Sequence, residues 1–198
     1  MLRSYTVADF FTLGNAACGT VSIFLMLTYV AEGGKNLIWI VCVLLSLALI
    51  LDIFDGYWAR HARRRSLLGA DLDSLSDIVS FGVAPAALGF ALGLRGAWDV
   101  LILTYFVVCG ISRLARFNVT ADELSGPSGK VAYFEGTPIP TSMLIVLLLA
   151  VAFGQGAIDD ALWGGGFRLG PATLHPLVLI YALSGTAMVS STLRVPKP

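Results

Sequence analysis

Long apolar segments alternate with short polar ones along the whole chain. Each apolar segment is long enough, or nearly so, to cross the roughly 30 Å hydrocarbon layer of a bilayer as a helix. They cover residues 14–31, 37–58, 74–94, 98–117, 139–156 and 174–193. The pattern predicts an all-α integral membrane protein with six transmembrane helices, in one domain over residues 1–198.

The polar stretches predict the connections. Residues 3–14 (RSYTVADFFTLG) pair Thr6 and Asp9 at capping-box spacing before an apolar face, which predicts a short helix lying in the membrane interface. Residues 120–138 are rich in Gly and Ser and predict a loop, with Pro138 and Pro140 suited to the start of the fifth helix. Residues 163–171 (WGGGFRLGP) predict the break between the last two helices.

Composition supports the membrane assignment and excludes an ordinary soluble domain. The chain is 57% hydrophobic and only 13% charged, and its mean hydropathy is +0.81. Thirteen Lys and Arg balance thirteen Asp and Glu. This balance gives no indication of a nucleic-acid partner, and none is expected.

The distribution of cations predicts the orientation. If the N-terminus is cytoplasmic, the cytoplasmic ends and loops carry ten Lys or Arg residues, and the outer side keeps Lys35, Arg95 and Arg168. The ten are Arg3, Arg60, Arg63, Arg64, Arg65, Arg113, Arg116, Lys130, Arg194 and Lys197. Positively charged residues accumulate on the cytoplasmic side. We therefore expect both termini in the cytoplasm. The compactness of the chain favours a bacterial plasma membrane as the location, with an archaeal or fungal origin open.

Carboxylates lie at the cytoplasmic ends of the second and third spans. Residues 37–51 carry no charge and cover about 22 Å of helix, so Asp52 and Asp55 fall at or just inside the edge of the hydrocarbon. Asp73 and Asp77 enter the third span at the same level, because residues 78–94 are uncharged. A carboxylate at this depth is costly unless it is paired or bound to a cation.

Helical geometry indicates which of these acids converge. At 100° per residue, Asp52 and Asp55 are about 60° apart on one face, which also carries Gly56 and Ala59. Asp73 and Asp77 are about 40° apart, with Gly69 one turn earlier. Asp71 points about 160° away from Asp73, so we expect it outside the site.

Four convergent carboxylates without His or Cys favour hard divalent cations, Mg²⁺, Mn²⁺ or Ca²⁺, over zinc. Cations beside small residues and arginines are what diphosphate chemistry requires, because they offset the charge of the transferring and leaving groups. We expect the arginines at 63–65 to contact anionic lipid, and Ser74, Ser76 and Ser80 to pack helices.

The acids belong to a longer motif, whose members are Asp52, Asp55, Gly56, Ala59, Arg60, Gly69, Asp73 and Asp77. Their order, D-x2-D-G-x2-A-R-x8-G-x3-D-x3-D, resembles the complete signature of the CDP-alcohol phosphotransferases, integral membrane enzymes of phospholipid synthesis. The resemblance implies a six-helix fold and a homodimer. Residues 8–24, 72–86, 112–119 and 133–143 further resemble the family members that use serine as acceptor.

The resemblance implies transfer of a phosphatidyl group from CDP-diacylglycerol to the hydroxyl of L-serine, with release of CMP. Two divalent cations, Mg²⁺ or Mn²⁺, would be held by Asp52, Asp55, Asp73 and Asp77, and Asp77 would also be the general base. The nucleotide would lie against Asp55, Gly56, Ala59, Arg60 and Gly69.

Three other polar residues are candidates for the site. Asn15, in the first span, either packs between helices or reaches the nucleotide. Arg113 and Arg116, three apart at the cytoplasmic end of the fourth span, either bind the serine carboxylate or a lipid phosphate, or anchor the helix at the membrane surface.

Two alternatives remain at this point. An archaetidylserine synthase, or a related enzyme with another acceptor such as glycerol 3-phosphate or inositol phosphate, would keep the same chemistry. A divalent-cation carrier would use the acids as an ion path. The position of the acids at one interface and the absence of an inverted repeat argue against the carrier.

Overall fold

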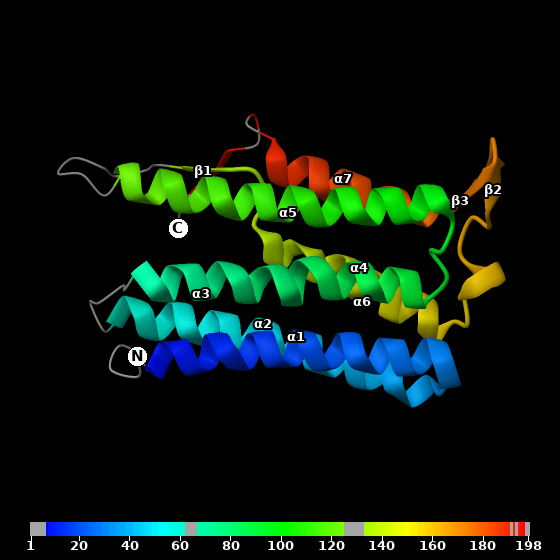
Figure 1. Ribbon diagram of the computed structural model, residues 1–198, viewed down its shortest axis with the longest axis horizontal. Coiled ribbons are helices and arrows are strands. Elements are labelled where there is room, and N and C mark those ends of the chain that lie inside the picture. Colours follow the sequence, from blue (N-terminus) through cyan, green and yellow to red (C-terminus); the bar gives the residue numbers. More distant parts are fainter. Residues whose placement is uncertain (1–6, 62–66, 125–132, 191, 193, 197–198) are drawn as a thin grey trace.

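The computed structural model describes residues 7–61, 67–124, 133–190, 192 and 194–196. In this part of the chain, six helical rods run roughly side by side, and their connections gather at the two ends of the bundle (Figure 1). The start of α1, the end of α5 and strand β1 lie at one end, and the hairpin of β2 and β3 lies at the other (Figure 1).

Four rods follow one another from the start of the described chain. They are α1 (Val7–Glu32), α2 (Lys35–His61), a third rod made of α3 (Leu67–Asp77), a π-helical segment (Ile78–Val83) and α4 (Ala84–Ala91), and α5 (Ala97–Leu124). Two shorter rods follow, α6 (Met143–Gly154) and α7 (Leu179–Val189), and each begins with a 3₁₀ turn, Ile139–Ser142 and Pro176–Val178. A further 3₁₀ turn covers Asp159–Ala161.

The membrane assignment agrees with the structure, whereas the count of six spans is not confirmed. The stretches Val7–Glu32, Lys35–Trp58, Gly69–Ala91 and Ala97–Val119 are long and apolar enough to cross a membrane. Ile139–Gly154 and Pro176–Val189 are apolar but shorter than the roughly 20 residues that a straight span needs. Proline starts both of these helices, as predicted for the first of them.

The predicted interfacial helix is not confirmed either. Residues 7–13 form the first turns of α1 and continue without a break into the span. The buried residues of α1 recur every three or four positions and are mostly polar or small: Asp9, Thr12, Asn15, Gly19, Ser22 and Met26. Large apolar side chains such as Phe10, Phe24 and Leu27 are exposed. This helix therefore directs its polar face into the bundle and its apolar face outward, as expected for a helix surrounded by lipid.

A π-helical segment interrupts the third rod directly after Asp77. Over Ile78–Val83 the backbone bonds to the fifth residue back, as in the bond from the Ala84 amide to the Val79 carbonyl. Such segments add one residue to the turn and are frequent near functional sites. Here α1 approaches closely, because a Cβ atom on Gly19 would lie 2.9 Å from Ser80 Cα. Only glycine allows this separation.

Short strands occupy two regions that the sequence predicted as loops or helix. Strand β1 (Tyr133–Glu135) pairs antiparallel with β4 (Arg194–Pro196), so that Glu135 lies opposite Arg194. Strands β2 (Phe167–Leu169) and β3 (Ala172–Leu174) form a hairpin, whose turn contains Gly170 at φ +66°. The sixth span was predicted to continue to residue 193, but α7 ends at Val189.

Candidate metal centre

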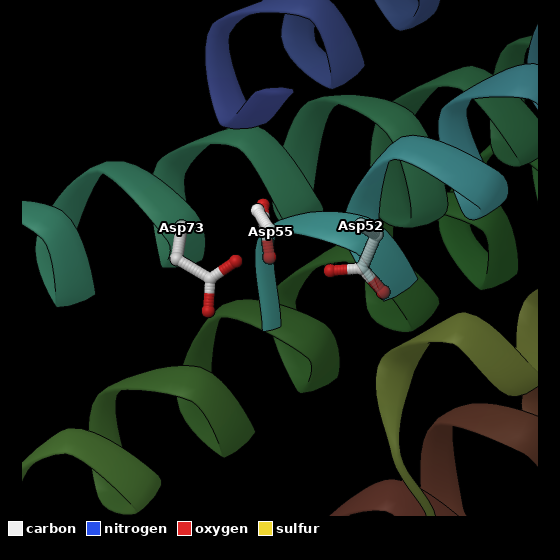
Figure 2. Close-up of side chains that lie close together, drawn as sticks. All are labelled: Asp52, Asp55 and Asp73. Atoms are coloured by element: carbon white, nitrogen blue, oxygen red, sulfur yellow. The ribbon is translucent and has the colours of Figure 1, made fainter. Parts of the chain in front are cut away.

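Carboxylates from two helices converge near one end of the bundle. Asp52 and Asp55 come from α2 and Asp73 comes from α3, and one oxygen of each lies within 4.8 Å of the others. Figure 2 shows the Asp73 and Asp52 side chains on either side of Asp55. The convergence that the spacing predicted for these three acids is therefore present.

Asp77, one turn after Asp73, completes the predicted set. It is 7% exposed, and the charges of Asp52, Asp73 and Asp55 all act on its carboxyl group. Asp77 is therefore part of the acid cluster, which we define as Asp52, Asp55, Asp73 and Asp77, although it lies outside the tight group of three.

Helix α1 supplies hydrogen-bond donors to two members of the acid cluster. The hydroxyl of Thr12 donates to Asp55 Oδ2 over 2.9 Å, and the amide of Asn15 donates to Asp77 Oδ1 over 3.4 Å. Thr12 is 4% exposed and Asn15 is fully buried. These hydrogen bonds replace part of the hydration that the two carboxylates lose on burial.

The third rod is fastened to α1 at the same level. Ser76 Oγ donates to the Thr12 carbonyl over 2.7 Å, and Ser80 Oγ donates to the Asn15 carbonyl over 2.9 Å. Ser74 and Asn118 exchange hydrogen bonds of 3.0 and 3.2 Å between α3 and α5. The expectation that these three serines pack helices is confirmed.

The chemistry of the donor set fits a hard divalent cation. The three closest groups are all carboxylates, and neither His nor Cys joins them among the described residues. Oxygen-only sets of this kind suit Mg²⁺, Mn²⁺ or Ca²⁺. Several carboxylates this close together repel one another strongly unless a cation lies between them. The geometry is therefore that of a candidate metal centre.

The other residues of the signature motif are close to the acids in the sequence. Gly56 lies next to Asp55, and a Cβ atom there would meet nothing within 4 Å, so space remains on that side of α2. Gly69 lies one turn before Asp73 in α3 and is partly buried. Ala59 and Arg60 belong to the last turns of α2, but their side chains lie outside the described part of the structure. Asp71 is exposed, as its predicted direction required.

The two arginines of α5 have different surroundings. Arg113 is partly buried, its guanidinium lies 5.7 Å from the centre of the Phe117 ring, and Asp77 is the charged group that acts on it. Arg116 donates instead to the carbonyl of Val189, at the end of α7, over 3.4 Å. The structure therefore places Arg113 within electrostatic range of Asp77, whereas the hydrogen bond of Arg116 is to the end of α7.

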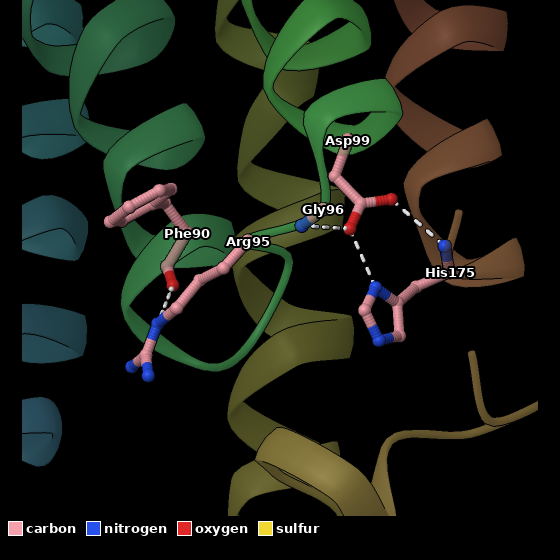
Figure 3. A network of polar contacts seen from close by, with 5 residues as sticks. All are labelled: Phe90, Arg95, Gly96, Asp99 and His175. Carbon is pink, nitrogen blue, oxygen red and sulfur yellow. Dashed lines mark hydrogen bonds and ion pairs between the residues drawn. The ribbon is translucent and has the colours of Figure 1, made fainter. Parts of the chain in front are cut away.

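A second polar network lies at the start of α5, at the opposite end of the bundle (Figure 1), and Figure 3 shows it from close by. Asp99 is fully buried and accepts hydrogen bonds from the backbone amides of Gly96 and His175, each over 2.8 Å. Its Oδ2 also lies 2.5 Å from His175 Nδ1. Asp99 thus caps α5 and fastens the segment before α7 to it.

Arg95, in the turn between α4 and α5, belongs to the same network. Its side chain donates to the carbonyls of Phe90 and Ala91, the last residues of α4, and pairs with Asp159 over 3.3 Å. All of these residues are engaged with one another or with helix ends. We assign this network to the stability of the fold.

Sequence reasoning missed Thr12 and the network around Asp99. Thr12 precedes Asn15 by three residues, so a polar pair at helical spacing, on either side of the predicted start of the first span, was the available signal. Asp99 and His175 are 76 residues apart, and no local pattern relates them.

The sequence of this chain is similar to those of several known proteins. The model of the CDP-alcohol phosphatidyltransferase family matches residues 5–187. The CDP-diacylglycerol–serine O-phosphatidyltransferase of Saccharomyces cerevisiae is 42% identical over 201 residues, which cover 100% of this chain and 73% of the yeast protein. The archaetidylserine synthase of Methanothermobacter thermautotrophicus is 38% identical, covering 70% of this chain and 54% of that protein. The Bacillus subtilis CDP-diacylglycerol–serine O-phosphatidyltransferase is 30% identical, covering 72% and 73%.

The acid cluster predicts a measurable loss of metal binding. Replacing Asp52 or Asp73 by Asn removes a charged oxygen ligand, and we expect the Kd for Mn²⁺ to rise about tenfold or more. Asp71→Asn is the matched control, because Asp71 is on α3 but exposed. Mn²⁺ titration of the detergent-purified protein, followed by electron paramagnetic resonance, measures the effect. Equal affinities in Asp71→Asn and Asp73→Asn would contradict this assignment.

Proposed function

The chain belongs to the CDP-alcohol phosphatidyltransferase family, and from this premise we propose that it transfers the phosphatidyl group of CDP-diacylglycerol to the hydroxyl of L-serine. One observation carries the proposal: the acids of the family signature converge from α2 and α3 into one cluster. The choice of substrates follows the serine-using yeast relative, whose similarity extends over this whole chain. The carrier alternative loses its basis, because the family consists of transferases.

Two divalent cations, Mg²⁺ or Mn²⁺, are proposed as the cofactors. Asp52, Asp55 and Asp73 would hold them, with Asp77 as a further ligand. When bound, the cations would offset the charge of the diphosphate and of the leaving CMP.

The reaction is a single in-line displacement at the phosphatidyl phosphorus. The serine oxygen forms a bond to that phosphorus, the bond from phosphorus to the CMP oxygen breaks, and the serine hydroxyl gives up its proton. No covalent enzyme intermediate is needed, so no nucleophilic Ser or Cys is assigned.

Asp77 is the proposed general base. It belongs to the acid cluster, and Asn15 holds one of its oxygens, so the carboxylate has a fixed orientation toward the site. Its duty is to accept the serine proton as the new bond forms. Because Asn15 is fully buried and engaged with Asp77, we propose that it orients the base and does not bind the nucleotide directly.

The nucleotide is proposed to lie along the end of α2 and the start of α3. The open space at Gly56 supports this position, because a phosphate or ribose can approach the backbone there. Asp55, Ala59, Arg60 and Gly69 would complete the contacts.

Arg113 is the proposed contact for the serine carboxylate. Its proximity to Asp77 would place the bound amino acid beside the base. Arg116 stays a weaker candidate, since its guanidinium contacts the end of α7.

An archaeol-based donor is the second candidate, because the archaetidylserine synthase is 38% identical over 70% of this chain. We also propose six spans, with α6 and α7 crossing as short helices, cytoplasmic termini and a homodimer. The relatives come from yeast, archaea and bacteria, so the bacterial plasma membrane stays a prediction from the sequence.

An acceptor panel tests the proposed function. The purified protein in mixed micelles is given CDP-diacylglycerol with serine, glycerol 3-phosphate or inositol phosphate, and CMP release is measured. We expect CMP release with serine and not with the other two acceptors. EDTA should stop this release, and added Mg²⁺ or Mn²⁺ should restore it. Release with another acceptor and not with serine would overturn the serine assignment. In a parallel reaction CDP-archaeol replaces CDP-diacylglycerol, and a faster reaction with CDP-archaeol would favour the second candidate.

Asp77→Asn tests the base. Removing a general base slows a reaction by about 10²- to 10⁴-fold, and we expect a loss of CMP release in this range while CDP-lipid binding is partly kept. Stopped turnover together with measurable binding of CDP-diacylglycerol would support the assignment. Substantial turnover in Asp77→Asn would exclude Asp77 as the base.

Arg113→Gln tests the serine contact. We expect the KM for serine to rise about tenfold, with a smaller change in the KM for CDP-diacylglycerol, because one charge-assisted contact is lost. Arg116→Gln is the matched variant one turn along α5 and should change the serine KM less. Equal increases in both KM values for Arg113→Gln would reassign this residue to the lipid phosphate.

A further inference from the structure

Helix α1 contributes none of the acids, yet it contacts the acid cluster directly. Thr12 Oγ1 lies 2.9 Å from Asp55 Oδ2, and 3.2 Å from the carbonyl of Ala8 in its own helix. A hydroxyl has one proton and can donate it to one acceptor at a time. The shorter contact is with an anionic oxygen, which is the stronger acceptor, so the proton points to Asp55.

This contact is shielded from water. Thr12 is 4% exposed and Asp55 is 6% exposed. In such surroundings a hydrogen bond to a charged group is stronger than on the surface, because no water competes for either partner. The Asp55 carboxylate therefore has one oxygen held from α1 while the group as a whole faces Asp52 and Asp73.

The position of Thr12 is itself fixed by α3. Ser76 Oγ donates to the carbonyl of Thr12 over 2.7 Å, and Ser80 repeats the contact one turn later at Asn15. Gly19 then lets the helices approach, since a Cβ atom there would collide with Ser80. A shift of α1 along the third rod would break these contacts, so they hold Thr12 in its position.

We propose that Thr12 is a positioning residue, whose hydroxyl orients the Asp55 carboxylate for a divalent cation. The inference rests on the proposed metal centre. Residues that hydrogen-bond a metal-ligating side chain fix its direction, and their loss lowers metal affinity. Thr12 plays this part from a helix that carries no residue of the signature motif.

Three variants separate the hydroxyl from the rest of the side chain. Thr12→Val keeps the shape and removes the hydroxyl, whereas Thr12→Ser keeps the hydroxyl and removes the methyl group. Thr20→Val is the matched control on α1, because Thr20 is exposed and its hydroxyl donates only to the Ala16 carbonyl. Size-exclusion chromatography and the melting temperature in detergent establish that each variant is folded.

The measurement is Mn²⁺ titration of the purified full chain by electron paramagnetic resonance, without lipid or serine. We expect the Kd for Mn²⁺ to rise about tenfold in Thr12→Val, and to stay within about twofold of the unmodified protein in Thr12→Ser and Thr20→Val. The Mn²⁺ concentration for half-maximal CMP release should shift in the same order, while the serine KM at saturating Mn²⁺ stays constant.

Two results would overturn the proposal. Folded Thr12→Val that binds Mn²⁺ like the unmodified protein would show that the hydroxyl does not orient Asp55. An equal loss in Thr12→Ser would assign the effect to packing of the methyl group. The titration needs neither substrate, so it is independent of the acceptor assay. If no acceptor gave CMP release but Thr12→Val alone weakened Mn²⁺ binding, the proposed reaction would be rejected and the role of Thr12 would be kept.

Discussion

Negative charge held inside an apolar bundle is the constraint on which the rest of this structure depends. Each buried carboxylate loses hydration at a cost on the order of several kcal/mol, and several of them within 5 Å repel one another. The donors of Thr12 and Asn15, the nearby Arg113 and the bound cations that we propose all act against this cost. The polar inner face of α1 supplies two of these donors at the level of the acid cluster.

Hydrogen bonds to the backbone join the helices near the site. Serine hydroxyls of the third rod donate to carbonyls of α1, so the two helices share hydrogen bonds at the level of the acids. Apolar packing alone gives little preference for one register over another in lipid, whereas these bonds select one register. At the far end of the bundle, buried Asp99 does the same for α5 and the segment before α7.

Much of the site could be predicted from the sequence, because its acids lie on two helices with regular spacing. The period of 3.6 residues was enough to group Asp52 with Asp55 and to exclude Asp71, which is exposed. Thr12 could not be assigned to Asp55, since the register between α1 and α2 is a tertiary property. The pairing of β1 with β4 was missed for a similar reason, because its strands are 59 residues apart at their nearest ends and are only three residues long. The number of spans was predicted from the length of the apolar segments. Two of the helices, which begin with proline, are apolar but shorter than a straight span requires.

The π-helical segment after Asp77 has a consequence for how this chain tolerates insertions and deletions. The wide turn absorbs one extra residue between the part of the rod that carries Asp73 and Asp77 and the part that packs against α7 through Gly89 and Tyr181. A further residue inserted next to Ile78–Val83 would not be absorbed, and it would turn one half of the rod against the other by about 100°. The acids would then leave their partners on α1 and α2 although none of them had been replaced. An insertion of one residue here therefore has the effect of several point substitutions.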